Sequence, residues 1–258
     1  MSAAMSQSAA SSQAAPILSC RGLVKRFGGL VAVNNVDLDI PAGEVIALVG
    51  DNGAGKSTLV QLLSGVFKAD AGTIRVHGEE TVLTAPEDAR RAGIETIYQD
   101  LALCDNLSAA RNIFLGRELE TRRFGFIPGV DRETMRSEAH KTLDELHIRI
   151  PDLDAPVRQL SGGQRQAVAI ARAVYWQAKL MIMDEPTAAL GVPEQRKVMA
   201  LISLLKSRQV PVVLISHNMS DVFEIADRIF VMRRGAKVGD FRTGETTPSE
   251  VVDLMIGG

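Results

Sequence analysis

The sequence contains few aromatic residues and few cysteines, and both shortages limit what the protein can be. Aromatic residues make up 4% of the 258 positions, so the core must be built mainly from aliphatic side chains. The two cysteines, Cys20 and Cys104, stand alone, without the spacing of a metal site or a disulfide framework. We therefore expect two reduced thiols that pack as small hydrophobic groups.

The chain also lacks a strong charge of either sign and any long apolar run. Its formal net charge is −2 and no extended cluster of Lys and Arg stands out, which argues against a nucleic-acid partner. No stretch approaches the roughly 20 apolar residues of a membrane span, so any membrane role must come through a partner. Residues 1–15 lack the basic and apolar regions of a signal peptide. We expect a disordered tail there and one domain over residues 16–258.

The most informative stretch reads Gly-Asp-Asn-Gly-Ala-Gly-Lys-Ser-Thr at residues 50–58. It follows an apolar run and precedes apolar residues at helical spacing, the strand–loop–helix context of a G-x-x-x-x-G-K-[ST] phosphate-binding loop. Glycines let backbone N–H groups surround an anion, and the following helix adds the positive end of its dipole. We expect Lys56 to reach the β- and γ-phosphates and Ser57 to bind Mg²⁺. The predicted nucleotide-binding residues of the loop are Gly50, Asp51, Asn52, Gly53, Ala54, Gly55, Lys56, Ser57 and Thr58.

Two later apolar runs also end in polar residues. Residues 180–183 are followed by Asp184 and Glu185, and residues 212–215 are followed shortly by His217. Ligands of open α/β sheets lie beyond the carboxyl ends of the strands. We therefore expect Asp184 to hold Mg²⁺ and Glu185 to orient or polarise an attacking water. The alternative is a solvated acidic pair and a structural histidine, and the nearby phosphate loop favours the catalytic interpretation.

Residues 160–164 read Leu-Ser-Gly-Gly-Gln and open a predicted helix over 165–176. Ser161 and Gln164 have the spacing of a capping box, which alone would explain both residues. A capped helix start that contains two glycines also presents free N–H groups to an anion. The two interpretations are compatible with each other.

The remaining pattern predicts a helical insert within an α/β body. Residues 100–158 form this insert, with helical periodicity at 109–115 and 135–146 and a break at 124–129. Phe27 lies between two predicted strands, at 16–22 and 33–40, where it either packs on a sheet or stacks on a flat base.

Together these motifs resemble the ATP-binding subunits of ABC transporters. The phosphate loop, Gln99, residues 160–164, residues 180–185 and His217 occur in the order and approximate spacing of that family. The resemblance covers about residues 17–258. It implies a P-loop NTPase core with a mostly parallel sheet, an antiparallel β subdomain and a helical subdomain insert. It also implies ATP and Mg²⁺ as cofactors, and ATP hydrolysis that drives a membrane permease.

The resemblance further implies a role for each motif. Phe27 would stack on adenine, and Gln99 would contact Mg²⁺ and the attacking water. His217 would contact the γ-phosphate and hold that water with Glu185. Two copies would form a head-to-tail dimer in which each copy contacts the γ-phosphate bound to the other. The residues that make this second contact would be Ser161, Gly162, Gly163 and Gln164.

Residues 184–191 depart from the common pattern of the family in an informative way. Their last four residues read Ala-Ala-Leu-Gly instead of Ser-Ala-Leu-Asp, so Gly191 replaces the aspartate that normally crosses the dimer interface. With residues 50–53 and 215–219, this stretch resembles the ATPases of bacterial monosaccharide importers of the ribose, xylose or fructose type. This implies a peripheral homodimer on the cytoplasmic face of the bacterial inner membrane. Its partners would be a permease and, indirectly, a secreted sugar-binding protein, and the sequence does not identify the sugar.

Four other functions compete with sugar import. One is an ABC ATPase of another transporter subclass, for amino acids or for export. A second is a soluble ABC ATPase that acts on DNA or ribosomes, but the short stretch between Gln99 and Ser161 has no room for the long coiled coil of DNA-repair relatives. A third is a P-loop kinase, which would leave residues 160–164 and His217 without a role. The fourth, an ATP-binding regulator without turnover, is disfavoured by Glu185 and His217.

Overall fold

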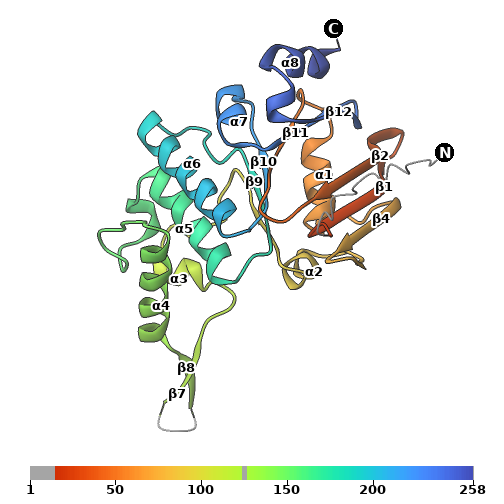
Figure 1. The fold of residues 1–258 in the computed structure, drawn as a ribbon. Helices are drawn as coiled ribbons and strands as arrows, with labels where there is room; N and C mark the ends of the chain where they lie inside the picture. The colour runs from red at the N-terminus through yellow and green to blue at the C-terminus, as the bar shows by residue number, and fades with distance from the viewer. Residues whose placement is uncertain (1–14, 124–126, 258) are drawn as a thin grey trace, which may run out of the picture.

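The computed structural model describes residues 15–123 and 127–257, so residues 1–14 of the predicted tail lie outside the described part. Its centre is a six-stranded sheet with the order β12-β11-β3-β10-β9-β6 (Figure 1). All neighbouring strands pair in parallel except β11 and β12. The strands are β3 (Val45–Val49), β6 (Ile94–Ile97), β9 (Leu180–Asp184), β10 (Val212–Ile215), β11 (Arg228–Arg233) and β12 (Ala236–Arg242).

A second sheet is antiparallel, with the order β2-β1-β4-β5. It consists of β1 (Leu18–Phe27), β2 (Leu30–Ile40), β4 (Ala71–Val76) and β5 (Glu79–Glu80). The prediction that the first strand ends at Gly22 is wrong. β1 continues to Phe27 because the register shifts near Gly22, whose positive φ of 60° suits a bulge, and pairing with β2 resumes beyond it. Phe27 is therefore the last residue of a strand and does not lie in a loop.

Alternating side chains of β3 face two separate cores. Val45, Ala47 and Val49 join the core formed with the helices of the insert and of the later chain. Ile46 and Leu48 join the core formed with the antiparallel sheet and α1 (Lys56–Leu63). Both faces of the parallel sheet are thus covered, which explains why its strands appear in the sequence as continuous apolar runs. The predicted α/β class is confirmed.

The insert between β6 and β9 is mainly helical, with α3 (Ala109–Ile113), α4 (Arg132–Glu145) and the 3₁₀ turn η1 (Val157–Gln159). It also contains a hairpin that the sequence analysis missed, β7 (Glu120–Arg123) paired with β8 (Ile127–Val130). The residues of β7 do not alternate between apolar and polar, so the hairpin carries no periodic signal. In Figure 1 the hairpin projects from the end of the insert.

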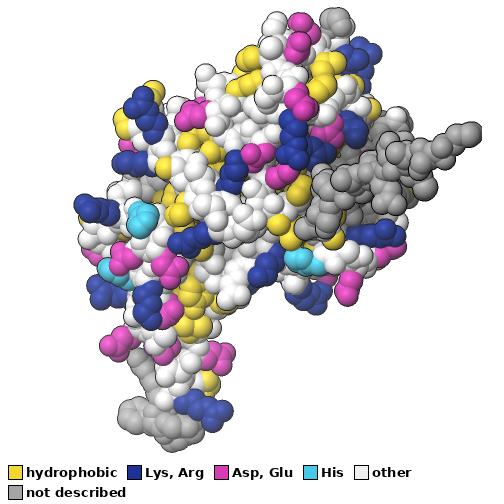
Figure 2. Space-filling model, viewed as in Figure 1, with side chains coloured by type: hydrophobic (Ala, Val, Ile, Leu, Met, Phe, Trp, Pro, Cys, Tyr) yellow, Lys and Arg dark blue, Asp and Glu magenta, His cyan; other side chains and the backbone are white. Residues whose placement is uncertain are grey.

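The other helices surround the central sheet. They are α2 (Pro86–Arg91), α5 (Gly162–Tyr175), α6 (Val192–Ser207), α7 (Met219–Ile225), η2 (Thr243–Glu245) and α8 (Pro248–Ile256). Among the described residues, no helix combines the length and hydropathy needed to cross a membrane. Figure 2 shows acidic and basic side chains interspersed over the face in view. Cys20 packs in the core as a free thiol, as expected, and burial raises its pKa to about 12.

Candidate nucleotide-binding site

The order of the parallel strands brings the predicted site residues to one edge of the sheet. Gln99 follows β6, Glu185 follows β9, His217 follows β10 and the phosphate loop follows β3. Because these strands are parallel, their carboxyl ends meet at the same edge. A cavity of about 520 Å³ opens there, lined by residues 52–58 together with Gln99, Asp184, Glu185 and His217.

The phosphate loop packs so closely that a glycine is required within it. Gly55 precedes α1 with a φ of 99°, and a Cβ built on it would lie 2.3 Å from the carbonyl oxygen of Ala32. The Nζ of Lys56 crosses the loop and donates hydrogen bonds to the carbonyl oxygens of Gly50 (2.7 Å) and Asp51 (3.0 Å). Burial lowers the pKa of Lys56, and the carboxylates of Glu185, Asp51 and Asp184 oppose that shift. The loop therefore holds one buried cation at its centre.

Glu185 and His217 form a pair beside this cation. The Oε1 of Glu185 lies 2.5 Å from the Nε2 of His217. Glu185 has a positive φ of 51°, which is costly for a residue with a side chain and is typical of functional sites. Its N–H donates to the carbonyl of Ile215 at 2.9 Å, which fixes the end of β9 against β10. This arrangement aims a carboxylate into the cavity and holds it there through a histidine.

The turn that carries Glu185 is supported by a buried network that the sequence analysis missed. Asp221 is 8% exposed, and its carboxylate accepts hydrogen bonds from Thr187 Oγ1 (2.9 Å) and Asn218 Nδ2 (3.0 Å). These contacts join the turn after β9 to the start of α7. Asp221 stands three residues after Asn218, a helix-start spacing that offered a local signal, but its contact with Thr187 depends on the tertiary fold.

Oxygen atoms suited to Mg²⁺ lie in the same cavity. Ser57, Gln99 and Asp184 all line it. The described residues contain no cluster of three or more His, Cys, Asp or Glu that would form a protein cage for a metal. Mg²⁺ usually binds through one or two protein oxygens together with water and substrate phosphates, so the residues present fit this cation. Burial, and then the charge of Glu185, raises the pKa of Asp184, whereas the charges of Lys56 and His217 oppose this shift.

Phe27 does not line the cavity. The residue is 42% exposed, and its ring packs edge-on against Phe67, with 5.1 Å between the ring centroids. The Nζ of Lys25 lies 5.6 Å from the same ring. The apolar side of the cavity is formed instead by residues 30–32 at the start of β2. Stacking of Phe27 on adenine therefore stays a prediction.

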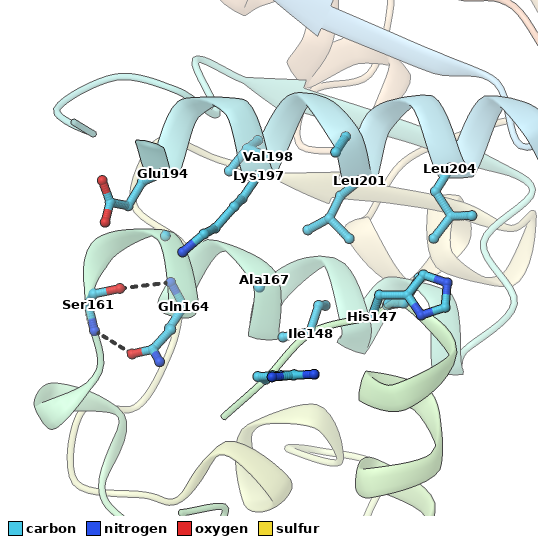
Figure 3. Close-up of a pocket in the computed structure, with 14 residues that line it drawn as sticks. His147, Ile148, Ser161, Gln164, Ala167, Glu194, Lys197, Val198, Leu201 and Leu204 are labelled. Atoms are coloured by element: carbon cyan, nitrogen blue, oxygen red, sulfur yellow. Dashed lines mark hydrogen bonds between the residues drawn. The ribbon is translucent and has the colours of Figure 1, made fainter. Parts of the chain in front are cut away.

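Residues 161–164 lie at a different place, at the start of α5. The capping box forms as predicted: Gln164 N–H donates to Ser161 Oγ (3.3 Å), and Ser161 N–H donates to Gln164 Oε1 (2.9 Å) (Figure 3). A Cβ on Gly163 would lie 2.9 Å from Cγ of Glu194, so this glycine lets α5 and α6 approach closely. Ser161, Gly163 and Gln164 line a separate cavity of about 650 Å³ between these helices, and none of them lines the phosphate-loop cavity.

Known proteins are similar to this chain in both sequence and fold. A xylose/arabinose import ATP-binding protein of Sulfolobus acidocaldarius is 47% identical over 93% of this chain and 93% of its own length. A fructose import ATP-binding protein of Rhizobium meliloti is 47% identical over 94% of each chain. A ribose import ATP-binding protein of Rubrobacter xylanophilus is 43% identical over 94% of this chain, which spans 46% of that longer protein.

Solved structures agree with the sequence comparison. The ADP conformation of MJ1267, an ATP-binding cassette of an ABC transporter, superimposes with a TM-score of 0.78 at 26% identity. That match covers 94% of this chain and 99% of the other. The post-hydrolysis dimer of the cassette MJ0796, bound to ADP and Pi, shares the fold with a TM-score of 0.72 at 24% identity, over 88% of this chain and 98% of the other. Residues 33–188 match the family described as ABC transporter. The chain therefore belongs to the ABC transporter family of ATP-binding proteins.

Proposed function

We propose that this chain is the ATP-hydrolysing motor subunit of a monosaccharide importer. The observation that carries the proposal is the Glu185–His217 pair, which lies in the same cavity as the phosphate loop. Relatives of nearly the same length are ATP-binding proteins for xylose/arabinose and fructose import, which supports monosaccharides as the cargo.

ATP binding is assigned to the phosphate loop. The N–H groups of residues 50–58 and the start of α1 would surround the phosphates, and Lys56 would exchange its contacts with the loop carbonyls for contacts with the β- and γ-phosphates. Ser57, Gln99 and Asp184 would hold Mg²⁺, which neutralises negative charge on the phosphate oxygens during hydrolysis.

Hydrolysis is assigned to Glu185 and His217. A water positioned by Glu185 would attack the γ-phosphorus, and the bond from that phosphorus to the β–γ bridging oxygen would break. Glu185 would accept the proton of the water as its oxygen bonds to phosphorus. His217 would donate to the γ-phosphate and keep the Glu185 carboxylate in place. The products are ADP and inorganic phosphate.

A complete site is assigned to two copies of the chain. Of the signature residues 161–164, Ser161, Gly163 and Gln164 line a separate cavity, and none of the four lines the cavity of the phosphate loop within one chain. In a head-to-tail dimer, Ser161 of the partner subunit would contact the γ-phosphate held at Lys56. Closing the two copies around ATP would then complete each site.

The helical insert is assigned to contact with a permease. A groove of about 280 Å³ lies between the core and the insert, lined by Arg90 and Glu95 from the core side and by Arg117 from the insert. A permease segment held there would move when the insert moves relative to the core. The proposal puts the chain at the cytoplasmic face of the membrane, with a sugar-binding protein as an indirect partner.

A pull-down tests this function. Tagged Glu185→Gln chain with MgATP, which is expected to stay bound to ATP, is used to capture partners from detergent-solubilised native membranes, read by mass spectrometry. A multi-span permease and a sugar-binding protein are the expected partners. Recovery of nucleic-acid machinery without any membrane protein would contradict the transport function and leave the ATPase chemistry intact.

A further inference from the structure

A fifth parallel strand reaches the functional edge of the sheet, and the residue that follows it has no assigned role. β11 pairs in parallel with β3, on the side of β3 away from β10. Arg234 follows the last residue of β11 and lines the phosphate-loop cavity. It thus follows β11 directly, as Glu185 follows β9, and His217 lies two residues beyond the end of β10.

The backbone fixes the place of Arg234 against the phosphate loop. Gly235 N–H donates to the carbonyl of Ala54 at 2.9 Å, and Asn34 N–H donates to the carbonyl of Gly235 at 2.8 Å. A Cβ on Gly55 would lie 3.2 Å from Cα of Gly235. The turn between β11 and β12 is therefore held against the loop that is assigned to the phosphates.

The turn itself disfavours an arginine. Arg234 and Gly235 are the two central residues of the hairpin, and both have positive φ, 49° and 81°. Such a turn strongly prefers Asn, Asp or Gly at its first central position. An arginine there carries a backbone cost, and costs of this kind gather at binding sites.

The charged side chains that line the cavity also point to Arg234. Among the described residues that line the cavity, Lys56 and Arg234 carry the Lys and Arg charges, and Asp184 and Glu185 carry the carboxylates. Within residues 15–123 and 127–257, Arg234 forms no ion pair, and its side chain is exposed. Its guanidinium is free to bind an anion, and without it the carboxylates would outnumber the Lys and Arg charges.

We propose that Arg234 is a further nucleotide-binding residue, whose guanidinium contacts the α-phosphate and ribose half of the nucleotide. Glu185 and His217 follow strands on the opposite side of β3, so the γ-phosphate points toward them and the nucleoside points toward β11. A guanidinium suits a phosphate because it donates two parallel hydrogen bonds. This inference rests on the proposed placement of the phosphates at Lys56.

Isothermal titration calorimetry with MgADP and with the non-hydrolysable analogue MgAMP-PNP tests the proposal on the full chain. Arg234→Ala should lower the affinity for both ligands by the same factor, roughly 3- to 10-fold, because both ligands contain the α-phosphate and the ribose that Arg234 would contact. Arg234→Lys, which keeps the charge, should recover part of the affinity, and steady-state ATPase should show the loss in KM more than in kcat. Arg75→Ala removes an equal charge from β4, outside the cavity, and serves as the matched control.

Arg234→Asn separates a binding role from a folding defect. Asparagine suits this turn, so the melting temperature should stay the same or rise while affinity for both ligands falls. Affinities equal to those of Arg75→Ala would overturn the proposal. A loss for MgAMP-PNP alone would also overturn it, because it would place Arg234 at the γ-phosphate. Lys56→Ala is measured in parallel: if it also binds normally, the proposed phosphate site fails as a whole, whereas its loss of binding beside a normal Arg234→Ala rejects this inference alone.

Discussion

At the scale of single residues, the site depends on a few charges held in fixed positions. Lys56 is 7% exposed and donates two hydrogen bonds across the phosphate loop, so it is ordered before any ligand arrives. An ordered cation loses little conformational entropy when phosphates bind. Such a side chain contributes more to affinity than a flexible lysine at the surface.

Lys56→Ala is therefore expected to lower ATP affinity by roughly 100-fold or more, since the charge that neutralises the phosphates is removed. A titration with a fluorescent nucleotide measures the effect. Thermal melting of the same variant shows whether the loop still folds. Unchanged affinity in a folded variant would remove the basis for the phosphate-loop assignment.

Glu185→Gln should retain ATP binding and slow hydrolysis by roughly 100- to 10,000-fold, because the amide cannot accept the proton of the attacking water. Release of phosphate in a single turnover measures the rate. Glu224→Gln, which changes an exposed glutamate of α7 outside the cavity, should behave like the original chain. Normal turnover by the Glu185 variant would mean that another group accepts the proton of the attacking water.

At the scale of elements, the turn after β9 is held by its neighbours. Glu185 lies at an unfavourable φ, and the bonds of Asp221 to Thr187 and Asn218 join this turn to α7. The same segment contains Gly191, which starts α6 without a side-chain cap. A strained catalytic turn thus depends on support from outside its own sequence.

Asp221→Ala should lower the free energy of unfolding by about 2 kcal/mol, because the buried hydroxyl of Thr187 and the side-chain amide of Asn218 lose their acceptor. It should also reduce the ATPase rate by loosening Glu185. Urea unfolding and a steady-state ATPase assay measure the two effects. Asp253→Ala, at an exposed position of α8, should change stability by less than about 0.5 kcal/mol. If the two variants are equally stable, the network has no supporting role.

The elements that were predicted best are those whose own residues carry the sequence pattern that indicates them. The apolar run before the phosphate loop and the one before His217 correspond to β3 and β10. The hairpin β7–β8 was missed because its order comes from cross-strand pairing of residues with no alternation. Asp221 and Arg234 were missed for a related reason, since burial and strand order assign their roles.

At the scale of the whole molecule, the sequence motifs divide into two groups. The phosphate loop, Gln99, Asp184, Glu185 and His217 share one cavity, whereas Ser161, Gly163 and Gln164 line another. The family resemblance implied this division, but the order of the motifs along the chain does not by itself say which motifs share a cavity. Two copies arranged head to tail would bring the groups together, and the cargo would be handled by other subunits.

The most direct test of this arrangement is the ATPase rate of a mixture of two inactive variants. Lys56→Ala lacks a working phosphate loop, and Ser161→Arg blocks the start of α5 while leaving its own loop intact. In a mixed dimer, one of the two sites combines the intact loop of one copy with the intact signature of the other. If equal amounts of the two variants pair at random, half of the dimers are mixed and each mixed dimer has one intact site of two. About one quarter of all sites should therefore be intact. Activity near that level would support sites shared between two copies, and a mixture as inactive as each variant alone, under conditions where the original chain turns over, would contradict them.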